Sequence, residues 1–238
     1  MKPSTAPDRP HHKNWPRRLP RQLAIPNTTL WFNLEVTATR FPDKPAYLFF
    51  GRALTYGELR RQAEAVAGWL QSVGVNAGER VAIFMQNCPQ YAAAWYGILR
   101  ANAVVVPVNP MNRAEEFKHF ITDPGTRVVI CSADLAAIVA SANAEVPPAQ
   151  RLAQVLVTRY TDAMPEGPID PADAPPAAMD AWLRSDPELP GDTCAGATCS
   201  PAASPLAPTQ RSPTTWPCCR TRRARPACPR AACTRPAP

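Results

Sequence analysis

The sequence has no run of apolar residues long enough to span a bilayer, which takes about 20 such residues. The N-terminus also lacks the continuous apolar segment of a secretory signal, because prolines interrupt its basic residues, at Pro3, Pro7, Pro10, Pro16 and Pro20. These absences argue against an integral membrane protein and against a secreted one. We therefore expect a cytoplasmic protein with at most peripheral membrane association.

Metal-binding patterns are missing as well. The eight cysteines include no C-x-x-C pair, and no histidine follows the six cysteines of residues 191–238, so the spacing argues against a zinc site. Cys88 and Cys131 stand near the ends of apolar runs, where we expect small buried residues in a reducing compartment. His11 and His12 lie in the proline-rich N-terminus, and His119 is expected on a helix surface.

Acidic residues are scarce in one part of the chain only. Residues 1–190 carry 19 Lys and Arg against 18 Asp and Glu, whereas residues 191–238 carry seven Arg and a single acid, Asp192. Nearly all of the net charge of +7 therefore belongs to residues 191–238, which we call the tail. The basic balance does not indicate a nucleic-acid surface on the body of the protein.

The stretch from Gly74 to Cys131 holds the clearest pattern in the chain. Three apolar, strand-like runs are separated by two helical patterns, which is typical of βαβ units on a parallel sheet. The second run does not alternate between apolar and polar residues, as expected of a strand buried on both faces. We predict strands at 80–85, 103–108, 128–131 and 152–157, helices at 89–101, 114–121 and 134–144, and a weak helix at 179–184.

The segment before this stretch predicts a helix at 28–41 and a small hairpin at 46–55. The clearest helix begins after Thr55, because Thr55-Tyr56-Gly57-Glu58 fits a capping box and an apolar stripe follows. Gly74 stands where a helix C-terminus favours a left-handed residue. Asn87 is expected to be the N-cap of the helix that starts at Pro89.

Composition divides the chain into three parts. Residues 1–26 have little to bury and are predicted to be a disordered lead-in. Residues 27–190 form the α/β domain. The tail has only Leu206 and Trp216 as large apolar residues, so it is predicted to be disordered.

Several segments resemble the start of the AMP-forming acyl-CoA synthetases, in order and at matching intervals. They are FPDKPAYLFFGRALTYGEL (41–59), GVNAGERVAIFMQNCPQY (74–91) and GILRANAVVVPVNPMNRAEEFKHFITD (97–123). One departure is Asn102, where the family more often has Gly before the second strand, and Asn tolerates a similar backbone conformation. The resemblance implies the incomplete N-terminal subdomain of an adenylate-forming ligase, with ATP, Mg²⁺ and coenzyme A as cofactors and a fatty acid as the substrate.

The residues that bind phosphate in this family are not found in the sequence. The family uses a Gly- and Thr-rich loop ending in Lys, and no run resembles T-S-G-T-T-G-x-P-K-G between Met1 and Pro238. We therefore assign no catalytic, no cofactor-binding and no metal-binding residue. We expect the fragment to bind ATP poorly, to be inactive on its own and to bind no nucleic acid.

The composition of the tail is one that translation in a shifted reading frame would give. One consistent codon choice for Thr215 to Arg235 reads, one frame away, as D-L-A-V-L-P-Y-T-S-G-T-T-G-L-P-K-G-C-M-H-T. This reading predicts a change of frame between Gly191 and Ala197. The alternatives are a non-catalytic α/β domain whose Arg-rich arm binds RNA or an acidic partner, and a cysteine-based metal knuckle, which the spacing disfavours.

Overall fold

The computed structural model describes residues 13–16, 18–20, 26–191 and 194–195. Its centre is a parallel sheet of five strands in the order β4-β3-β5-β6-β7. The predicted α/β class with a parallel sheet is confirmed. The strands are β3 (Arg80–Phe84), β4 (Val104–Val108), β5 (Val128–Ser132), β6 (Gln154–Thr158) and the two-residue β7 (Cys194–Ala195).

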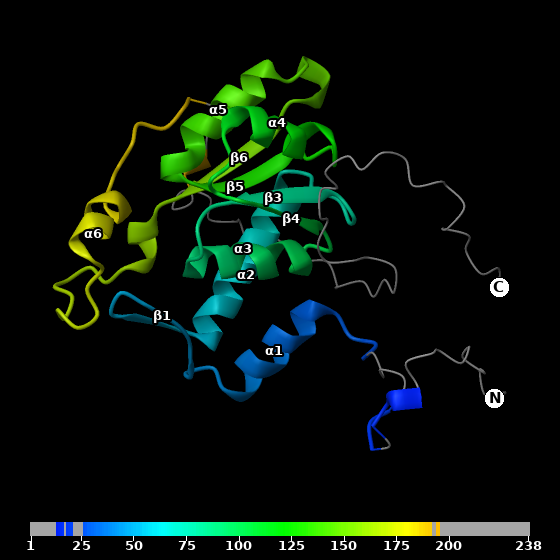
Figure 1. Cartoon of the computed structure of the whole chain (residues 1–238), viewed down its shortest axis with the longest axis vertical. Helices are drawn as coiled ribbons and strands as arrows, with labels where there is room; N and C mark the ends of the chain where they lie inside the picture. Colours follow the sequence, from blue (N-terminus) through cyan, green and yellow to red (C-terminus); the bar gives the residue numbers. More distant parts are fainter. Residues whose placement is uncertain (1–12, 17, 21–25, 192–193, 196–238) are drawn as a thin grey trace.

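Helices lie on both sides of this sheet (Figure 1). On one side are α4 (Ala114–Thr122) and α5 (Ala136–Glu145), and on the other are α2 (Tyr56–Ser72) and α3 (Pro89–Arg100). Short 3-10 turns follow at η2 (Ala133–Leu135), η3 (Pro148–Gln150) and η4 (Tyr160–Ala163), and α6 (Ala177–Leu183) comes last among the helices. Among the described residues, no helix is long and apolar enough to cross a membrane.

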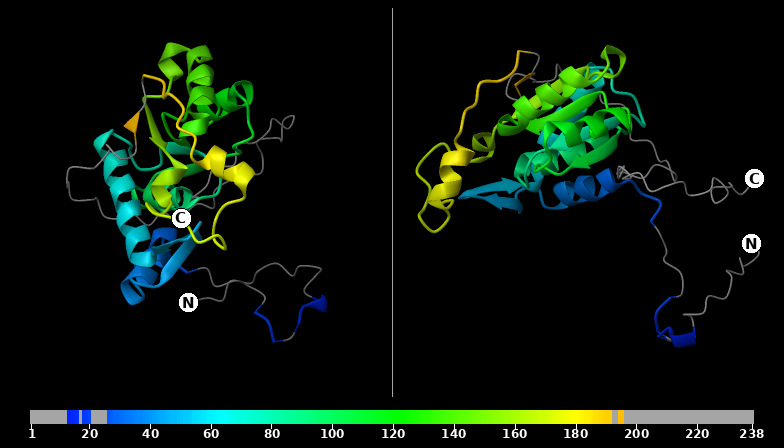
Figure 2. Two further views of the ribbon diagram at one scale, coloured as in Figure 1. Left: turned by 90° about the vertical axis from the view of Figure 1, so that its left-hand side faces the viewer. Right: turned by 45° about the horizontal axis from the view of Figure 1, so that its top comes forward.

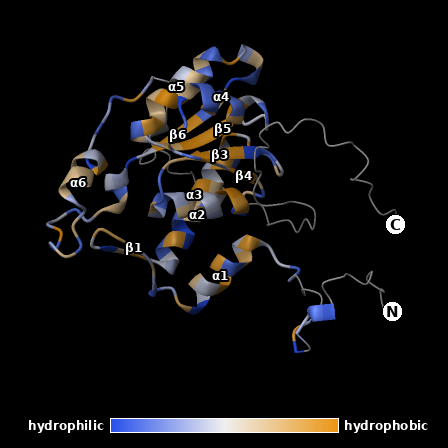
Figure 3. Ribbon diagram, in the orientation of Figure 1, coloured by the Kyte–Doolittle hydropathy of each residue, from blue (hydrophilic) through white to orange (hydrophobic). Residues whose placement is uncertain are grey.

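The alternation of side chains along β3 explains the two layers of helices. Val81 and Ile83 point into the core shared with α2 and α3, while Ala82 and Phe84 point into the core shared with α4 and α5. The Phe84 ring lies 4.6 Å from that of Phe117 on α4. Because both faces are buried, β3 to β6 are apolar over most of their length, as Figure 3 shows, and polar residues stand only at strand ends.

The N-terminal elements lie beyond α2 and α3, on the side away from α4 and α5 (Figure 2). They are α1 (Leu30–Arg40) and a hairpin of β1 (Pro45–Phe49) with β2 (Arg52–Thr55). Phe50 and Gly51 make the hairpin turn with φ of 44° and 82°. Trp31 and Leu34 of α1 pack with Leu54 and Leu59 in a third core. The predicted helix and hairpin are confirmed.

Helix α2 begins as its sequence predicts. The Thr55 hydroxyl accepts from the Glu58 backbone N–H at 3.2 Å, and the Glu58 carboxylate accepts from the Thr55 N–H at 2.9 Å. Gly74, just after the helix, has a φ of 83°, and Asn102 has a φ of 60°. Both left-handed positions carry residues that tolerate them.

Helices α2 and α3 pack closely against each other, because Gly97 has no side chain. A Cβ atom at Gly97 would lie 2.6 Å from Cβ of Val66 and 2.9 Å from the carbonyl oxygen of Ala63. This contact holds the two helices together on one side of the sheet.

One sequence prediction is wrong. Asn87 is not the N-cap of α3; Cys88 holds that position, with φ of −153° and ψ of 167°. The reason is Pro89, which forces an extended conformation on the residue directly before it and so moves the cap to Cys88.

Strand β7 was not predicted. It pairs in parallel with β6, through Leu156 with Cys194 and Val157 with Ala195. The predictions of disorder for 1–26 and for the tail fall largely outside the described residues and stay predictions, as does the change of reading frame.

Candidate functional site

The carboxyl end of the parallel sheet is the first place to look for a site. The chain leaves β3 toward α3 on one face and leaves β5 toward α5 on the other. Between two strands whose connections diverge in this way, open α/β sheets leave a crevice where ligands bind. In this protein the rule places that crevice between the end of β3 at Phe84 and the end of β5 at Ser132.

The crevice is occupied by a side chain of the protein itself, that of Tyr160 in η4. The Tyr160 hydroxyl donates to the Ser132 hydroxyl at 3.1 Å and accepts from the backbone N–H of Gln86 at 3.2 Å. Burial raises the pKa of Tyr160 to about 12, so the phenol is neutral at physiological pH. Through these two hydrogen bonds Tyr160 joins the ends of β3 and β5 and fills the space between them. We call Tyr160 the plug.

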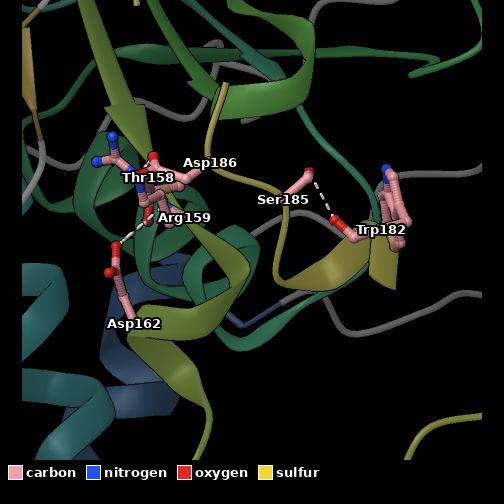
Figure 4. Close-up of polar contacts among 6 residues, drawn as sticks. All are labelled: Thr158, Arg159, Asp162, Trp182, Ser185 and Asp186. Carbon is pink, nitrogen blue, oxygen red and sulfur yellow. Dashed lines mark hydrogen bonds and ion pairs between the residues drawn. The ribbon is translucent and has the colours of Figure 1, made fainter. Parts of the chain in front are cut away.

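A segment after η4 packs over this plug. The Trp182 ring of α6 lies 4.8 Å from that of Tyr160, and its Nε1–H donates to Asp134 at 3.1 Å. Figure 4 shows Arg159 and Asp186 close together, joined by an ion pair of 2.7 Å. Asp162 accepts from the backbone N–H of Arg159 at 2.9 Å and so caps η4. Trp182 and Asp186 thus tie the α6 segment to the carboxyl end of the sheet.

The two cysteines near the sheet are not activated nucleophiles. Burial raises the pKa of Cys88 to about 11, and burial together with the charge of Asp134 raises that of Cys131 to about 12. Thiols with such pKa values are protonated at pH 7 and react slowly, since the thiolate is the reactive form. The prediction that both are small buried residues is confirmed.

A groove of about 440 Å³ lies on the α2 and α3 side of the sheet. Ile130 of β5 and Leu156 of β6 line it from the sheet, and the two helices supply its walls. Its rim is more polar. The lining residues are Arg52, Leu54, Gln62, Ala65, Val66, Trp69, Pro89, Gln90, Ala93, Ala94, Ile130, Leu156, Thr158, Asp162 and Ala163.

Two contacts define the rim of the groove. The Arg52 guanidinium donates to the backbone oxygen of Asp162 at 3.0 Å, which links the hairpin to η4. The Gln90 side chain donates to the backbone oxygen of Arg159 at 2.8 Å. Its own oxygen, Oε1, is buried and has no hydrogen-bond partner among the described residues.

From the sequence we assigned no catalytic, cofactor-binding or metal-binding residue, and this remains a prediction. Over residues 13–16, 18–20, 26–191 and 194–195, no three His, Cys, Asp or Glu side chains gather as they would around a metal ion. The groove and the plug were not foreseen, because they join elements that are distant in sequence. Only the polar and aromatic residues of η4, directly after a buried strand, could have hinted at them.

Comparison with protein families gives one clear match. The family model described as "AMP-binding enzyme" matches residues 34–208, more than half of the chain.

Among curated proteins, the chain is similar to the long-chain-fatty-acid–CoA ligase of Bacillus subtilis (strain 168), 37% identical over 122 residues. That match covers 51% of this chain and 22% of the relative. The ligase of the same description from Salmonella typhimurium is 39% identical over 103 residues, 43% of this chain and 18% of the relative. The chain thus spans about a fifth of the length of these relatives.

Solved structures of acyl-CoA ligases share this fold. The benzoate CoA ligase of Burkholderia xenovorans LB400 matches with a TM-score of 0.51 and 26% identity, over 55% of this chain and 26% of that one. The fatty acyl CoA synthetase of Mycobacterium tuberculosis matches with a TM-score of 0.51 and 25% identity, over 70% and 30% of the two chains.

Proposed function

Because the chain belongs to the AMP-binding enzyme family, we propose that it is the N-terminal portion of a ligase that joins a medium- or long-chain fatty acid to coenzyme A. The observation that carries this proposal is the similarity of about half of this chain to long-chain-fatty-acid–CoA ligases. The ordered segments at 41–59, 74–91 and 97–123 support it.

The proposed reaction has two steps. A carboxylate oxygen of the fatty acid attacks the α-phosphorus of ATP, pyrophosphate leaves, and an acyl-adenylate forms. The thiol of coenzyme A then attacks the acyl carbon and displaces AMP. Mg²⁺ would neutralise charge on the phosphates in the first step.

In this proposal, residues 27–190 supply architecture and the chain alone does not form the adenylate. The sequence holds no Gly- and Thr-rich loop ending in Lys, and the crevice at the carboxyl end of the sheet is occupied by Tyr160. Removing one donor from a charge-stabilising site costs about 10²- to 10³-fold in rate, so loss of a whole loop predicts turnover below detection.

Pyrophosphate exchange into ATP, with a long-chain fatty acid present, tests this proposal on the purified 238-residue chain. The full-length Bacillus subtilis relative is the positive control. We expect no exchange from the chain alone, and exchange above background would refute the proposed inactivity. Salt-sensitive RNA binding without exchange would favour the alternative, a non-catalytic domain with an Arg-rich arm.

The nucleotide sequence around Gly191 tests the account of the tail. If the frame shifted by one base encodes the phosphate loop, the tail is a displaced reading of that segment. If the shifted frame lacks those codons, the account is wrong, while the family assignment of residues 34–208 is unaffected.

A further inference from the structure

The connection from β6 to β7 does not cover a face of the sheet. Parallel strands need a crossover of this kind, and the crossover usually contains a helix that packs on the sheet. Here that helix is α6, and it buries a single side chain, that of Leu183. Figure 1 shows α6 at one end of the molecule, beside the hairpin of β1 and β2. It lies against the crevice, where its Trp182 ring contacts Tyr160.

Residues 165–188, which include α6, bury very little of their own surface. Within this range only Pro175 and Leu183 are buried. Ile169 is half-buried against the hairpin turn, and its Cγ2 would lie 3.2 Å from a Cβ atom at Gly51. The backbone hydrogen bonds that the range makes with described residues all lie inside the range. Few buried side chains and self-contained hydrogen bonds are typical of a segment that can open separately from the rest of a domain.

Two polar contacts hold this range to the carboxyl end of the sheet. Trp182 donates to Asp134 at 3.1 Å, and Asp186 forms an ion pair with Arg159 at 2.7 Å. The side chain of Asp186 is 72% exposed, so water and salt weaken its attraction for Arg159. The attachment therefore depends mainly on the Trp182 ring and on the buried Leu183 beside it.

These contacts cover the plug. Tyr160 is 6% exposed, and it belongs to the same apolar core as Leu183. A molecule that approaches the ends of β3 and β5 from the side of α6 must first displace Trp182.

We propose that residues 165–188 form a strap that opens as a unit while the sheet stays folded, and that its opening exposes Tyr160 and the ends of β3 and β5. The strap thereby controls access to the crevice. It is independent of the proposed function, because its test uses neither substrate nor nucleotide.

Hydroxyl-radical footprinting of the full 238-residue chain, read by peptide mass spectrometry, measures the exposure of Tyr160. Leu183→Asp removes the buried anchor of the strap and retains the Trp182 side chain that covers the plug. We expect Tyr160 to be oxidised at least about fivefold faster in this variant than in the wild type. Met179→Asp, at an exposed position of the same helix, is the matched control and should change the rate by less than about twofold.

Asp186→Lys tests the strap without any change in the core. The new Lys places a positive charge beside Arg159, so oxidation of Tyr160 should rise about twofold at low salt. Salt should then act in opposite directions on the two proteins. About 1 M NaCl should raise the oxidation of Tyr160 in the wild type, where it screens an attraction, and lower it in Asp186→Lys, where it screens a repulsion.

Phe84 and Phe117 pack against each other on the opposite side of the sheet, so their oxidation reports whether the whole domain opens. Faster oxidation of Tyr160 with unchanged Phe84 and Phe117 supports the strap. If Leu183→Asp unfolds the domain, Asp186→Lys alone decides. In Asp186→Lys, a Tyr160 that stays as protected as in the wild type overturns the strap, and so does an equal rise at all three rings.

Discussion

Gly97 offers the sharpest test of how the two helices beside the groove pack. In an isolated helix, replacing Gly by Ala stabilises by about 1 kcal/mol, because Ala loses less backbone entropy. Here the new methyl group would lie 2.6 Å from Cβ and 2.7 Å from Cγ1 of Val66. It would also lie 2.9 Å from the backbone oxygen of Ala63, which cannot rotate away. Overpacking costs about 1–3 kcal/mol, and three contacts under 3.0 Å, one with backbone, put this site at about 2–3 kcal/mol. The clash should therefore outweigh the helix preference of about 1 kcal/mol.

We therefore expect Gly97→Ala to lower the free energy of unfolding by about 1–2 kcal/mol, measured by urea denaturation followed by circular dichroism. Gly167→Ala is the control, because a Cβ there would have no neighbour within 4 Å. Its effect should stay within about 0.5 kcal/mol. In a Val66→Ala background the penalty of Gly97→Ala should shrink by about 0.5 kcal/mol, since the contact with Cγ1 disappears and only those with Cβ of residue 66 and the Ala63 oxygen remain. A Gly97→Ala protein as stable as the wild type, or a penalty unchanged by Val66→Ala, would refute the close packing of α2 on α3.

Three further predictions concern the plug, the cap of α2 and the buried thiols. Tyr160→Phe should lower the free energy of unfolding, measured by urea denaturation, by about 1–3 kcal/mol, because the Ser132 hydroxyl and the Gln86 N–H each lose a partner. Adding Ser132→Ala should recover part of that loss. A Tyr160→Phe protein as stable as the wild type would contradict the role of Tyr160 as the plug. The bond from the Thr55 backbone N–H lowers the pKa of Glu58 below its ordinary 4.5, so its contribution is present above that value and is lost as the pH falls through the lower, folded-state pKa. Thermal unfolding between pH 3 and 7 should then show a weaker acid dependence for Glu58→Gln than for the wild type, and parallel curves would disprove the cap. Iodoacetamide at pH 8 should leave Cys88 and Cys131 unmodified in the native protein and modify them in concentrated urea, as read by peptide mass spectrometry; rapid native labelling of either would contradict its raised pKa.

The elements that the sequence predicts well are those specified by neighbouring residues. The capping box of Thr55 and Glu58 spans one helical turn, and the apolar runs of β3 to β6 are continuous, so each can be read locally. Asn87 was misassigned because two local signals compete at the start of α3, a capping side chain and a proline, and the proline prevails. Two-residue β7 is too short to show a period, and its pairing with β6 depends on residues almost forty positions earlier.

The candidate site could not be read in the same way. Tyr160 forms hydrogen bonds with Gln86, 74 positions before it, and with Ser132, 28 positions before it. No spacing in the sequence predicts either contact. The groove likewise collects side chains from β2, α2, α3, β5, β6 and η4. The family, in contrast, was visible in the sequence, because its segments occur in order along residues 41–123.

The position of β3 between β4 and β5 also constrains how this protein is made on the ribosome. Its two neighbours, β4 and β5, both follow it in the chain, and the second ends only at Ser132. When Phe84 has just emerged from the ribosome, the nascent chain therefore carries an apolar strand, β3, with neither of its two neighbouring strands available to pair with it. Such surfaces aggregate, and pairings between distant residues form slowly, so holdase chaperones should bind nascent chains most strongly between the emergence of β3 and that of β5.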